Sequence, residues 1–285
     1  MLRFEYLRAK DLKEALRILQ GEGVYPIAGG TNLLADIRSE TIRPRAVLDI
    51  GFLPELKELN HRDGKIEMGP CLTMAQIADA PMIKSKVPIL SESAASVGGP
   101  QIRNRATPGG NIASASPAAD TVVALVALGA EVTLHGTTAE RGLLLEDLFL
   151  ESGRTKIRRD ELLTRISFRS LSPDERSVFF KLGRRNSMAI SVVNLAIVAA
   201  NDGEVERWRS VRIVLGAVAP TVIRARKAEA FLCNRRIERS LFREAARLAA
   251  SECSPISDIR ASAEYRKAMV EVLVEDGLTR LAGRS

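Results

Sequence analysis

Residues 105–120 read Arg-Ala-Thr-Pro-Gly-Gly-Asn-Ile-Ala-Ser-Ala-Ser-Pro-Ala-Ala-Asp, a run of small and polar side chains around two adjacent glycines. Side chains this small allow a flat ring system to lie against the backbone. Hydroxyl and amide groups at Thr107, Asn111 and Ser114 can hydrogen-bond phosphate or ring heteroatoms. The stretch therefore predicts a ligand-binding loop immediately before a helix.

Two other features of this stretch bear on the geometry of the loop. Pro108 lacks an N–H, but we expect the N–H groups of Gly109 and Gly110 to remain free for a ligand. Asp120 falls in the first turn of the helix predicted over residues 118–128. There it could accept hydrogen bonds from ligand hydroxyls, or act only as a favourable acid in the first turn.

A second glycine pair lies in Pro-Ile-Ala-Gly-Gly-Thr-Asn-Leu, residues 26–33, after a strand predicted over residues 24–28. Gly29 and Gly30 can adopt positive φ, so that successive backbone N–H groups point at one anion. The hydroxyl of Thr31 can donate as well, and a following helix would add the positive end of its dipole. The alternative is a plain tight turn, because the pair matches neither G-x-G-x-x-G nor the P-loop pattern.

Around these two segments the chain alternates between helix and strand signals. Helices are predicted over residues 12–19, 73–80, 88–98 and 118–128, strands over 24–28, 46–50, 65–69 and 131–135, and a long polar loop over 101–116. Beyond the Ser170–Asp174 turn, a predicted domain boundary, β-branched runs at 177–182, 190–200 and 205–215 indicate strands. The tail after Val222 predicts amphipathic helices. These patterns alone indicate only a mixed α/β class.

Composition excludes several classes of function. Three cysteines without a Cys-x-x-Cys pair and two histidines supply no disulfide framework, metal site or Ser-His-Asp triad. The apolar runs are too short to span a bilayer and the N-terminus has no signal-peptide pattern, so we expect a cytoplasmic protein without membrane insertion. The net charge of +7 is dispersed and aromatic residues make up 4%, which favours a basic face for an acidic partner subunit, or for pyrophosphate, over nucleic-acid binding.

Three motifs together carry a family resemblance: Ala28-Gly29-Gly30-Thr31, Thr107-x-Gly109-Gly110-Asn111 and Ser116-Pro117-x-x-Asp120. They resemble the FAD-binding medium subunit of the xanthine dehydrogenase and carbon monoxide dehydrogenase family, the molybdenum hydroxylases. The resemblance extends over nearly the whole chain, because residues 101–105 and 180–185 also fall in the expected order. It implies an α+β fold. Residues 1–170 would form a two-subdomain FAD-binding domain of the vanillyl-alcohol-oxidase/PCMH type, and residues 171–285 a C-terminal antiparallel sheet with helices.

The resemblance also implies roles for individual residues. The FAD pyrophosphate would be wrapped by Ile27, Ala28, Gly29, Gly30, Thr31, Asn32 and Leu33, and the cofactor lined by Thr107, Gly109, Gly110, Asn111 and Ser114. Asp120 would bind the ribityl chain, Leu162 would pack near the flavin, and Lys181 would lie at its pyrimidine side. A cation there stabilises the anionic reduced flavin and raises its potential, whereas a solvated strand lysine is the alternative. Two departures from the family pattern are Pro108, in place of an aliphatic residue, and Val97, where some members have an aromatic ring. No catalytic residue and no metal ligand is expected.

The same resemblance implies partners. A molybdopterin-binding large subunit and a [2Fe–2S] small subunit would be separate polypeptides of a heterotrimer, with FAD as the redox centre of this chain. Electrons would pass from the clusters to FAD and on to NAD, a quinone or oxygen. A self-sufficient FAD-dependent oxidase or dehydrogenase of the same flavin fold is the alternative, disfavoured by the scarcity of histidines and the lack of a large substrate domain.

Overall fold

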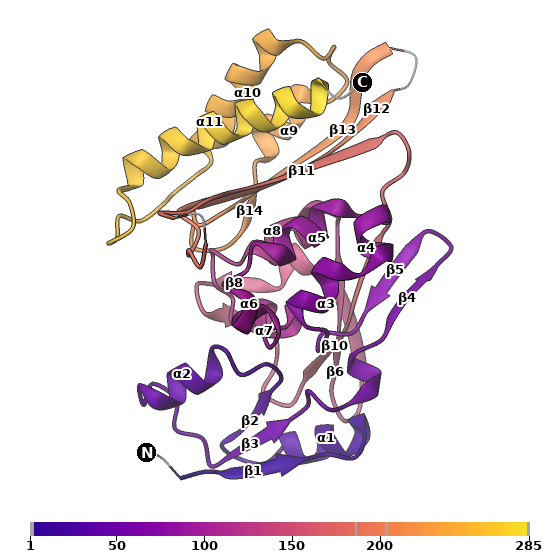
Figure 1. The fold of residues 1–285 in the computed structure, drawn as a ribbon, viewed down its shortest axis with the longest axis vertical. Helices are drawn as coiled ribbons and strands as arrows, with labels where there is room; N and C mark the ends of the chain where they lie inside the picture. Colours follow the sequence, from indigo (N-terminus) through magenta and orange to yellow (C-terminus); the bar gives the residue numbers. More distant parts are fainter. Residues whose placement is uncertain (1–2, 186, 203–204, 284–285) are drawn as a thin grey trace.

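The computed structural model describes residues 3–185, 187–202 and 205–283, and begins with a small parallel sheet. Its strands are β1 (Glu5–Arg8), β3 (Ala46–Asp49) and β2 (Val24–Ile27), in that order, with helices α1 (Leu12–Leu19) and α2 (Leu33–Arg38) between them in sequence. The predicted helix over residues 12–19 is confirmed: the Asp11 side chain accepts from the Glu14 N–H, and Ala15, Leu16 and Leu19 are buried. This layer occupies the N-terminal end of the molecule (Figure 1).

The second layer is an antiparallel sheet of strands β4 (Leu59–Arg62), β5 (Lys65–Met68), β10 (Leu162–Arg169), β6 (Glu131–His135) and β7 (Glu140–Leu144), in the order β4-β5-β10-β6-β7. The short element η1 (Pro54–Leu56) leads from β3 to β4, and η2 (Leu145–Asp147), β8 (Phe149–Glu151) and β9 (Arg154–Thr155) lead from β7 to β10. Helices α3 (Met74–Asp79), α4 (Pro81–Lys86), α5 (Pro88–Ala95) and α8 (Asp120–Ala127) complete this part. Thr73 and Gln76 form the capping box that begins α3. Every residue of α8 is buried, so this helix lies at the centre of the molecule.

The third layer is an antiparallel sheet of consecutive strands: β11 (Glu175–Leu182), β12 (Val193–Asp202), β13 (Val205–Gly216) and β14 (Ile223–Arg224). Helices α9 (Arg226–Leu232), α10 (Arg239–Ser251) and α11 (Ala263–Ala282) lie over one face, and α5 and α8 pack on the other (Figure 1). Coverage on both faces explains why Leu195–Ala200 is a continuous apolar run rather than an alternating one. The predicted α+β class, with a C-terminal antiparallel sheet and helices, is confirmed.

One prediction of secondary structure is wrong. The expected long loop over residues 101–116 contains two short helices, α6 (Pro100–Arg103) and α7 (Pro108–Ala113). Each begins with proline at its first position, where the missing N–H costs no hydrogen bond. Thr107 also caps α7 by accepting from the Gly110 N–H. The prolines at the helix starts and the Thr107 cap outweigh the low helix propensity of the two glycines.

Candidate cofactor-binding cleft

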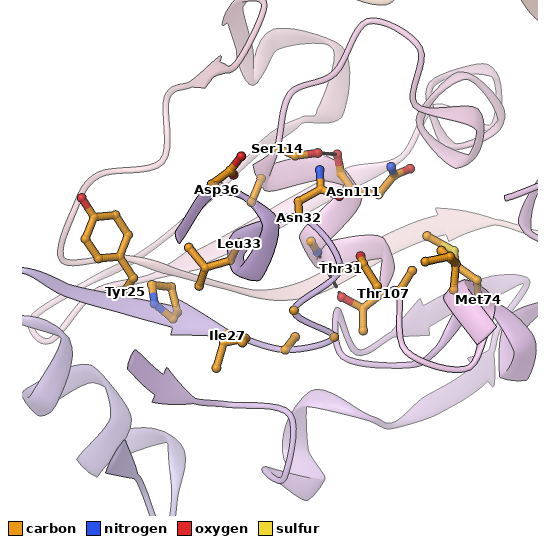
Figure 2. A pocket seen from close by; sticks show the side chains of 18 of the residues that line it. Tyr25, Ile27, Thr31, Asn32, Leu33, Asp36, Met74, Thr107, Asn111 and Ser114 are labelled. Carbon is orange, nitrogen blue, oxygen red and sulfur yellow. Dashed lines mark hydrogen bonds between the residues drawn. The ribbon is translucent and has the colours of Figure 1, made fainter. Parts of the chain in front are cut away.

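A cleft of about 400 Å³ lies where the two glycine segments meet (Figure 2). This volume is within the range of small-molecule and cofactor sites. One wall is the turn from β2 into α2, residues 25–33 together with Asp36 and Ile42. The other wall comes from α7 and the ends of α3, α5 and α6: Met74, Val97, Ile102, Ala106, Thr107, Gly110, Asn111, Ala113 and Ser114. The cleft therefore separates the first layer of the fold from the second.

The first wall presents unpartnered backbone donors. Gly30 has φ of +74°, which turns the chain sharply between β2 and α2. Within the described part of the chain, the N–H groups of Gly29, Gly30, Thr31 and Asn32 donate to no backbone or side-chain acceptor. The backbone N–H groups that lead into a helix have no partner within it, so a run of four such donors along a cleft offers a place for an anionic ligand.

Gly29 also explains how closely the two walls approach. A Cβ atom built at Gly29 would lie 1.9 Å from the carbonyl oxygen of Arg105 and 3.1 Å from the Cα of Ala106. No side chain can occupy this position without separating the β2–α2 turn from the residues before α7. The glycine is therefore required for the two segments to form one cleft.

The second glycine pair has a different role from the one expected. The N–H of Gly109 donates to Pro70 O at 2.9 Å, and that of Gly110 to Thr107 Oγ1 at 3.1 Å. The expectation that both groups are free for a ligand is thus wrong, because the helix cap and the neighbouring Pro70 use them. Gly109 does not line the cleft; a Cβ there would lie 2.7 Å from Pro70 Cβ, so this glycine serves packing.

Because these backbone donors are used, the polar groups that the second wall offers a ligand are side chains. Thr107 Oγ1 accepts from Gly110 and keeps its own proton for another acceptor. Asn111 Oδ1 accepts from Thr121 Oγ1 at 2.6 Å, and Ser114 Oγ donates to Asn111 O at 2.9 Å. This wall can therefore hydrogen-bond a ligand through its side chains, opposite the free backbone donors.

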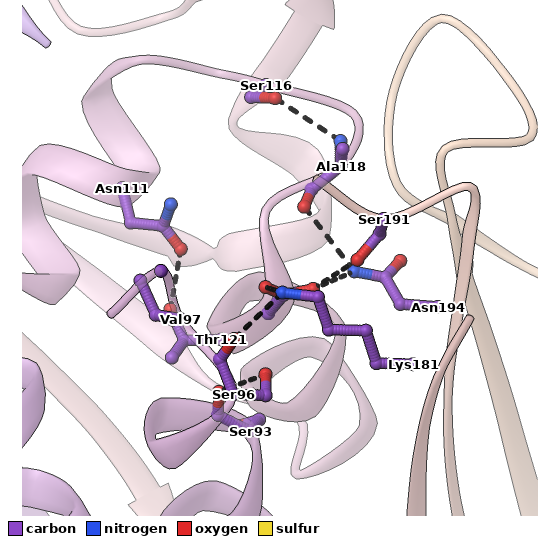
Figure 3. A network of polar contacts seen from close by, with 12 residues as sticks. Ser93, Ser96, Val97, Asn111, Ser116, Ala118, Thr121, Lys181, Ser191 and Asn194 are labelled. Atoms are coloured by element: carbon purple, nitrogen blue, oxygen red, sulfur yellow. Dashed lines mark hydrogen bonds and ion pairs between the residues drawn. The ribbon is translucent and has the colours of Figure 1, made fainter. Parts of the chain in front are cut away.

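Asp120 and Lys181 are not among the residues that line the cleft, and Figure 3 shows Lys181, Ser191 and Asn194 in one network of polar contacts. Asp120 is 6% exposed, and its Oδ1 accepts from Ser191 Oγ at 2.6 Å and from Asn194 Nδ2 at 2.8 Å. Lys181 Nζ lies 2.5 Å from Asp120 Oδ2 and donates to Ser96 O at 2.8 Å. Ser96 precedes Val97, which lines the cleft, so this network links the C-terminal sheet to the wall. We call these four side chains the Asp120 cluster: Asp120, Lys181, Ser191 and Asn194.

Leu162 is the remaining residue singled out from the sequence, and it too lies outside the lining. It begins β10, is 3% exposed, and packs in the core of the first layer. Conversely, the lining includes residues that sequence reasoning missed: Tyr25, Pro26, Asp36, Ile42, Met74, Ile102, Ala106 and Ala113. Most are apolar or small and carry no chemical pattern, so no motif signal could have identified them before the fold was known.

The chemistry of the cleft is that of binding. Asp36 and Tyr25 are the ionisable side chains among its described lining, and no histidine or cysteine is among them. Burial raises the pKa of the Cys71 and Cys253 thiols to about 12, so both stay protonated at neutral pH. The described residues contain no group of three metal-ligating side chains. Across the same residues, no helix combines the length and apolar character that crossing a bilayer requires.

The comparisons with known proteins agree with this geometry. Residues 2–168 match the model of the FAD binding domain in molybdopterin dehydrogenase, and residues 178–281 match that of the CO dehydrogenase flavoprotein C-terminal domain. The glyceraldehyde dehydrogenase medium chain of Sulfolobus acidocaldarius is 31% identical, with 95% of each chain covered. The xanthine dehydrogenase FAD-binding subunit of Escherichia coli is 28% identical, over 95% of this chain and 93% of that protein.

A solved structure, carbon monoxide dehydrogenase from Hydrogenophaga pseudoflava, superposes with a TM-score of 0.94 at 28% identity, covering 98% of this chain and 97% of that one. The two family models together cover residues 2–168 and 178–281, and the likeness extends to sequence as well as fold. The chain therefore belongs to the family of FAD-binding medium subunits of the molybdenum hydroxylases, oxidoreductases that include xanthine dehydrogenase and carbon monoxide dehydrogenase.

Proposed function

We propose that this chain holds FAD in the cleft and carries electrons from the [2Fe–2S] clusters of a partner subunit to an external acceptor. The observation that carries the proposal is the run of four unpartnered backbone donors from Gly29 to Asn32, in a chain whose residues 2–168 match an FAD-binding domain. Bound FAD supplies the redox chemistry, and the protein supplies its position and its electrostatic surroundings.

The two walls of the cleft would contact different parts of FAD. Residues Ile27–Leu33 would surround the pyrophosphate, because the free N–H groups of Gly29–Asn32 suit phosphate oxygens and Gly29 lets the walls close on it. Thr107, Gly110, Asn111 and Ser114 would line the opposite side. Gly109 would support them by packing on Pro70.

Three residues behind the lining complete the assignment. Asp120 and Lys181 would lie beyond the wall that faces the ribityl chain and the pyrimidine edge, and Leu162 would pack near the flavin. The close Asp120 carboxylate offsets the charge of Lys181, so the effect of this lysine on the flavin potential depends on both groups.

The partners follow from what the cleft lacks. Its lining has one carboxylate, Asp36, and neither histidine nor cysteine, so it has no set of side chains for activating an organic substrate. Substrate hydroxylation is therefore assigned to a separate molybdopterin-binding subunit, and delivery of electrons to a [2Fe–2S] subunit. The names of the relatives, "medium chain" and "FAD-binding subunit", support a multi-subunit complex. NAD, a quinone or oxygen would be the acceptor, and residues near 170 would separate the FAD-binding and C-terminal domains.

The test is purification of the native complex through a tag on this chain. We expect a yellow preparation that releases FAD rather than FMN on denaturation and contains molybdenum and iron in fixed ratio to flavin. A chain that purifies alone and oxidises a substrate with FAD as its sole redox group would support the self-sufficient oxidase instead. A colourless chain that cannot be reconstituted with FAD would contradict flavin binding itself.

A further inference from the structure

The side chain of Asn111 is a polar group of the cleft whose orientation the structure defines. A carboxamide has an acceptor end, Oδ1, and a donor end, Nδ2, and a ligand distinguishes between them. Asn111 lines the cleft from helix α7, opposite the free backbone donors of the β2–α2 turn. Which end of the amide faces the ligand therefore determines what the second wall recognises.

Thr121 sets this orientation from behind. It lies in α8, has no exposed surface, and its Oγ1 donates to Asn111 Oδ1 at 2.6 Å. Figure 3 shows the amide oxygen turned toward Thr121 and the amide nitrogen turned away from it. If the amide were reversed, the Thr121 proton would lose this acceptor, and in the described structure its hydroxyl donates to no other atom. Because a buried hydroxyl without an acceptor is costly, the reversed amide is disfavoured.

The position of Thr121 is itself fixed by its neighbour. Asp120 is the preceding residue, and its carboxylate is held by Lys181, Ser191 and Asn194 of the C-terminal layer. The start of α8 is therefore tied to the third sheet on one side and to Asn111 on the other. The C-terminal sheet thereby holds the start of the helix from which Thr121 reaches Asn111.

We propose that Thr121 is a positioning residue that presents Asn111 to FAD as a hydrogen-bond donor. The group facing Asn111 must then be an acceptor, such as a phosphate oxygen or a flavin carbonyl, and a ligand with a donor at this point is disfavoured. The proposal rests on the FAD-binding function and on the assignment of Asn111 to the cofactor.

The experiment measures the FAD dissociation constant of apoprotein variants by flavin fluorescence, with the urea unfolding midpoint measured for each. Thr121→Val keeps the shape but removes the hydroxyl, Thr121→Ser keeps the hydroxyl, and Asn111→Ala removes the amide. We expect Asn111→Ala to raise the dissociation constant about tenfold and Thr121→Val about fivefold, with Thr121→Ser near wild type. In the Asn111→Ala background, Thr121→Val should cause no further loss of affinity, and it should lower the urea midpoint less than it does in the wild type, because the Thr121 hydroxyl has already lost its acceptor there.

The outcomes separate the steps of the argument. If Thr121→Val weakens FAD binding equally in both backgrounds, it acts through general packing and the positioning role is overturned. If Asn111→Ala binds FAD as wild type does, the contact of Asn111 with the cofactor fails, and the positioning role with it, although FAD binding by the chain stands. If Thr121→Val does not fold, the variant Asn111→Asp provides the test. Its carboxylate presents only hydrogen-bond acceptors, so this variant must bind FAD more weakly than Asn111→Ala does. Equal or tighter binding overturns the proposal.

Discussion

Replacing Gly29 by alanine adds one methyl group at the point where the two cleft walls touch. The new Cβ would lie 1.9 Å from the Arg105 carbonyl oxygen, and that oxygen would have to move by about 1.1 Å to reach the 3.0 Å that real Cβ contacts respect. The obstacle is backbone, which cannot rotate away as a flexible side chain can. We expect the substitution to destabilise the fold by about 1–3 kcal/mol, as overpacking does.

The same displacement should weaken FAD binding. A donor at 2.9 Å that moves away by an ångström no longer makes a hydrogen bond. Losing one bond to a charged phosphate costs about 1.5–3 kcal/mol, which raises the dissociation constant roughly 10- to 100-fold. Fluorescence titration of the apoprotein with FAD measures this change, and urea unfolding measures the stability.

Gly142→Ala is the matched control, because a Cβ at this strand position would approach nothing closer than 3.9 Å. It should leave both affinity and stability near wild type. If Gly29→Ala bound FAD with wild-type affinity and unfolded at the wild-type midpoint, the close contact between the two glycine segments would not exist in solution, and the description of the cleft would be wrong.

Three further substitutions test other parts of the structure. Gly110→Val should abolish FAD retention, measured as the ratio of flavin to protein absorbance, because the isopropyl group would enter the cleft. The urea midpoint should change little, since a Cβ at this position meets only Thr107 Oγ1, at 3.2 Å. Lys181→Met should cost about 3–5 kcal/mol of stability, because it leaves Asp120 buried without its ammonium partner. It should also lower the flavin potential. An unchanged urea unfolding midpoint would show that the pair is not buried. Burial tends to raise the pKa of Glu175, but hydrogen bonds from Arg169 and Ser172 hold it below its ordinary 4.5. Its stabilising effect is therefore present above that value and lost as the pH falls through the depressed pKa, so Glu175→Gln should flatten the acid side of the stability profile in urea unfolding.

Local signals in the sequence were sufficient for much of the fold. Asp11 and Thr73 mark the starts of α1 and α3 because each side chain caps the helix that follows it. The apolar run of β12 likewise identifies a strand covered on both faces. β10 could not be found in this way, since it pairs with β5 and β6, strands far from it in sequence, and its place at the centre of the sheet depends on those pairings.

The candidate site shows the same division. The glycine pair at residues 29–30 was recognisable because close backbone approach and positive φ both require glycine. The sequence did not show that the N–H groups of Gly109 and Gly110 are already hydrogen-bonded, because these bonds depend on the Thr107 side chain and on the carbonyl oxygen of Pro70. The sequence supplied the residue types of the cleft, whereas the tertiary contacts decided which atoms are free to bind.

The Asp120 cluster has a consequence for exchanging parts between members of the family. A buried carboxylate in one half of the chain receives its donors from Lys181, Ser191 and Asn194 in the other half. A chimaera that grafts a foreign C-terminal half onto residues 1–170 would have to bring donors at these three positions, or bury an uncompensated negative charge at the junction. The two halves are therefore not freely interchangeable, and donors matched to this carboxylate are one requirement for a hybrid subunit to fold.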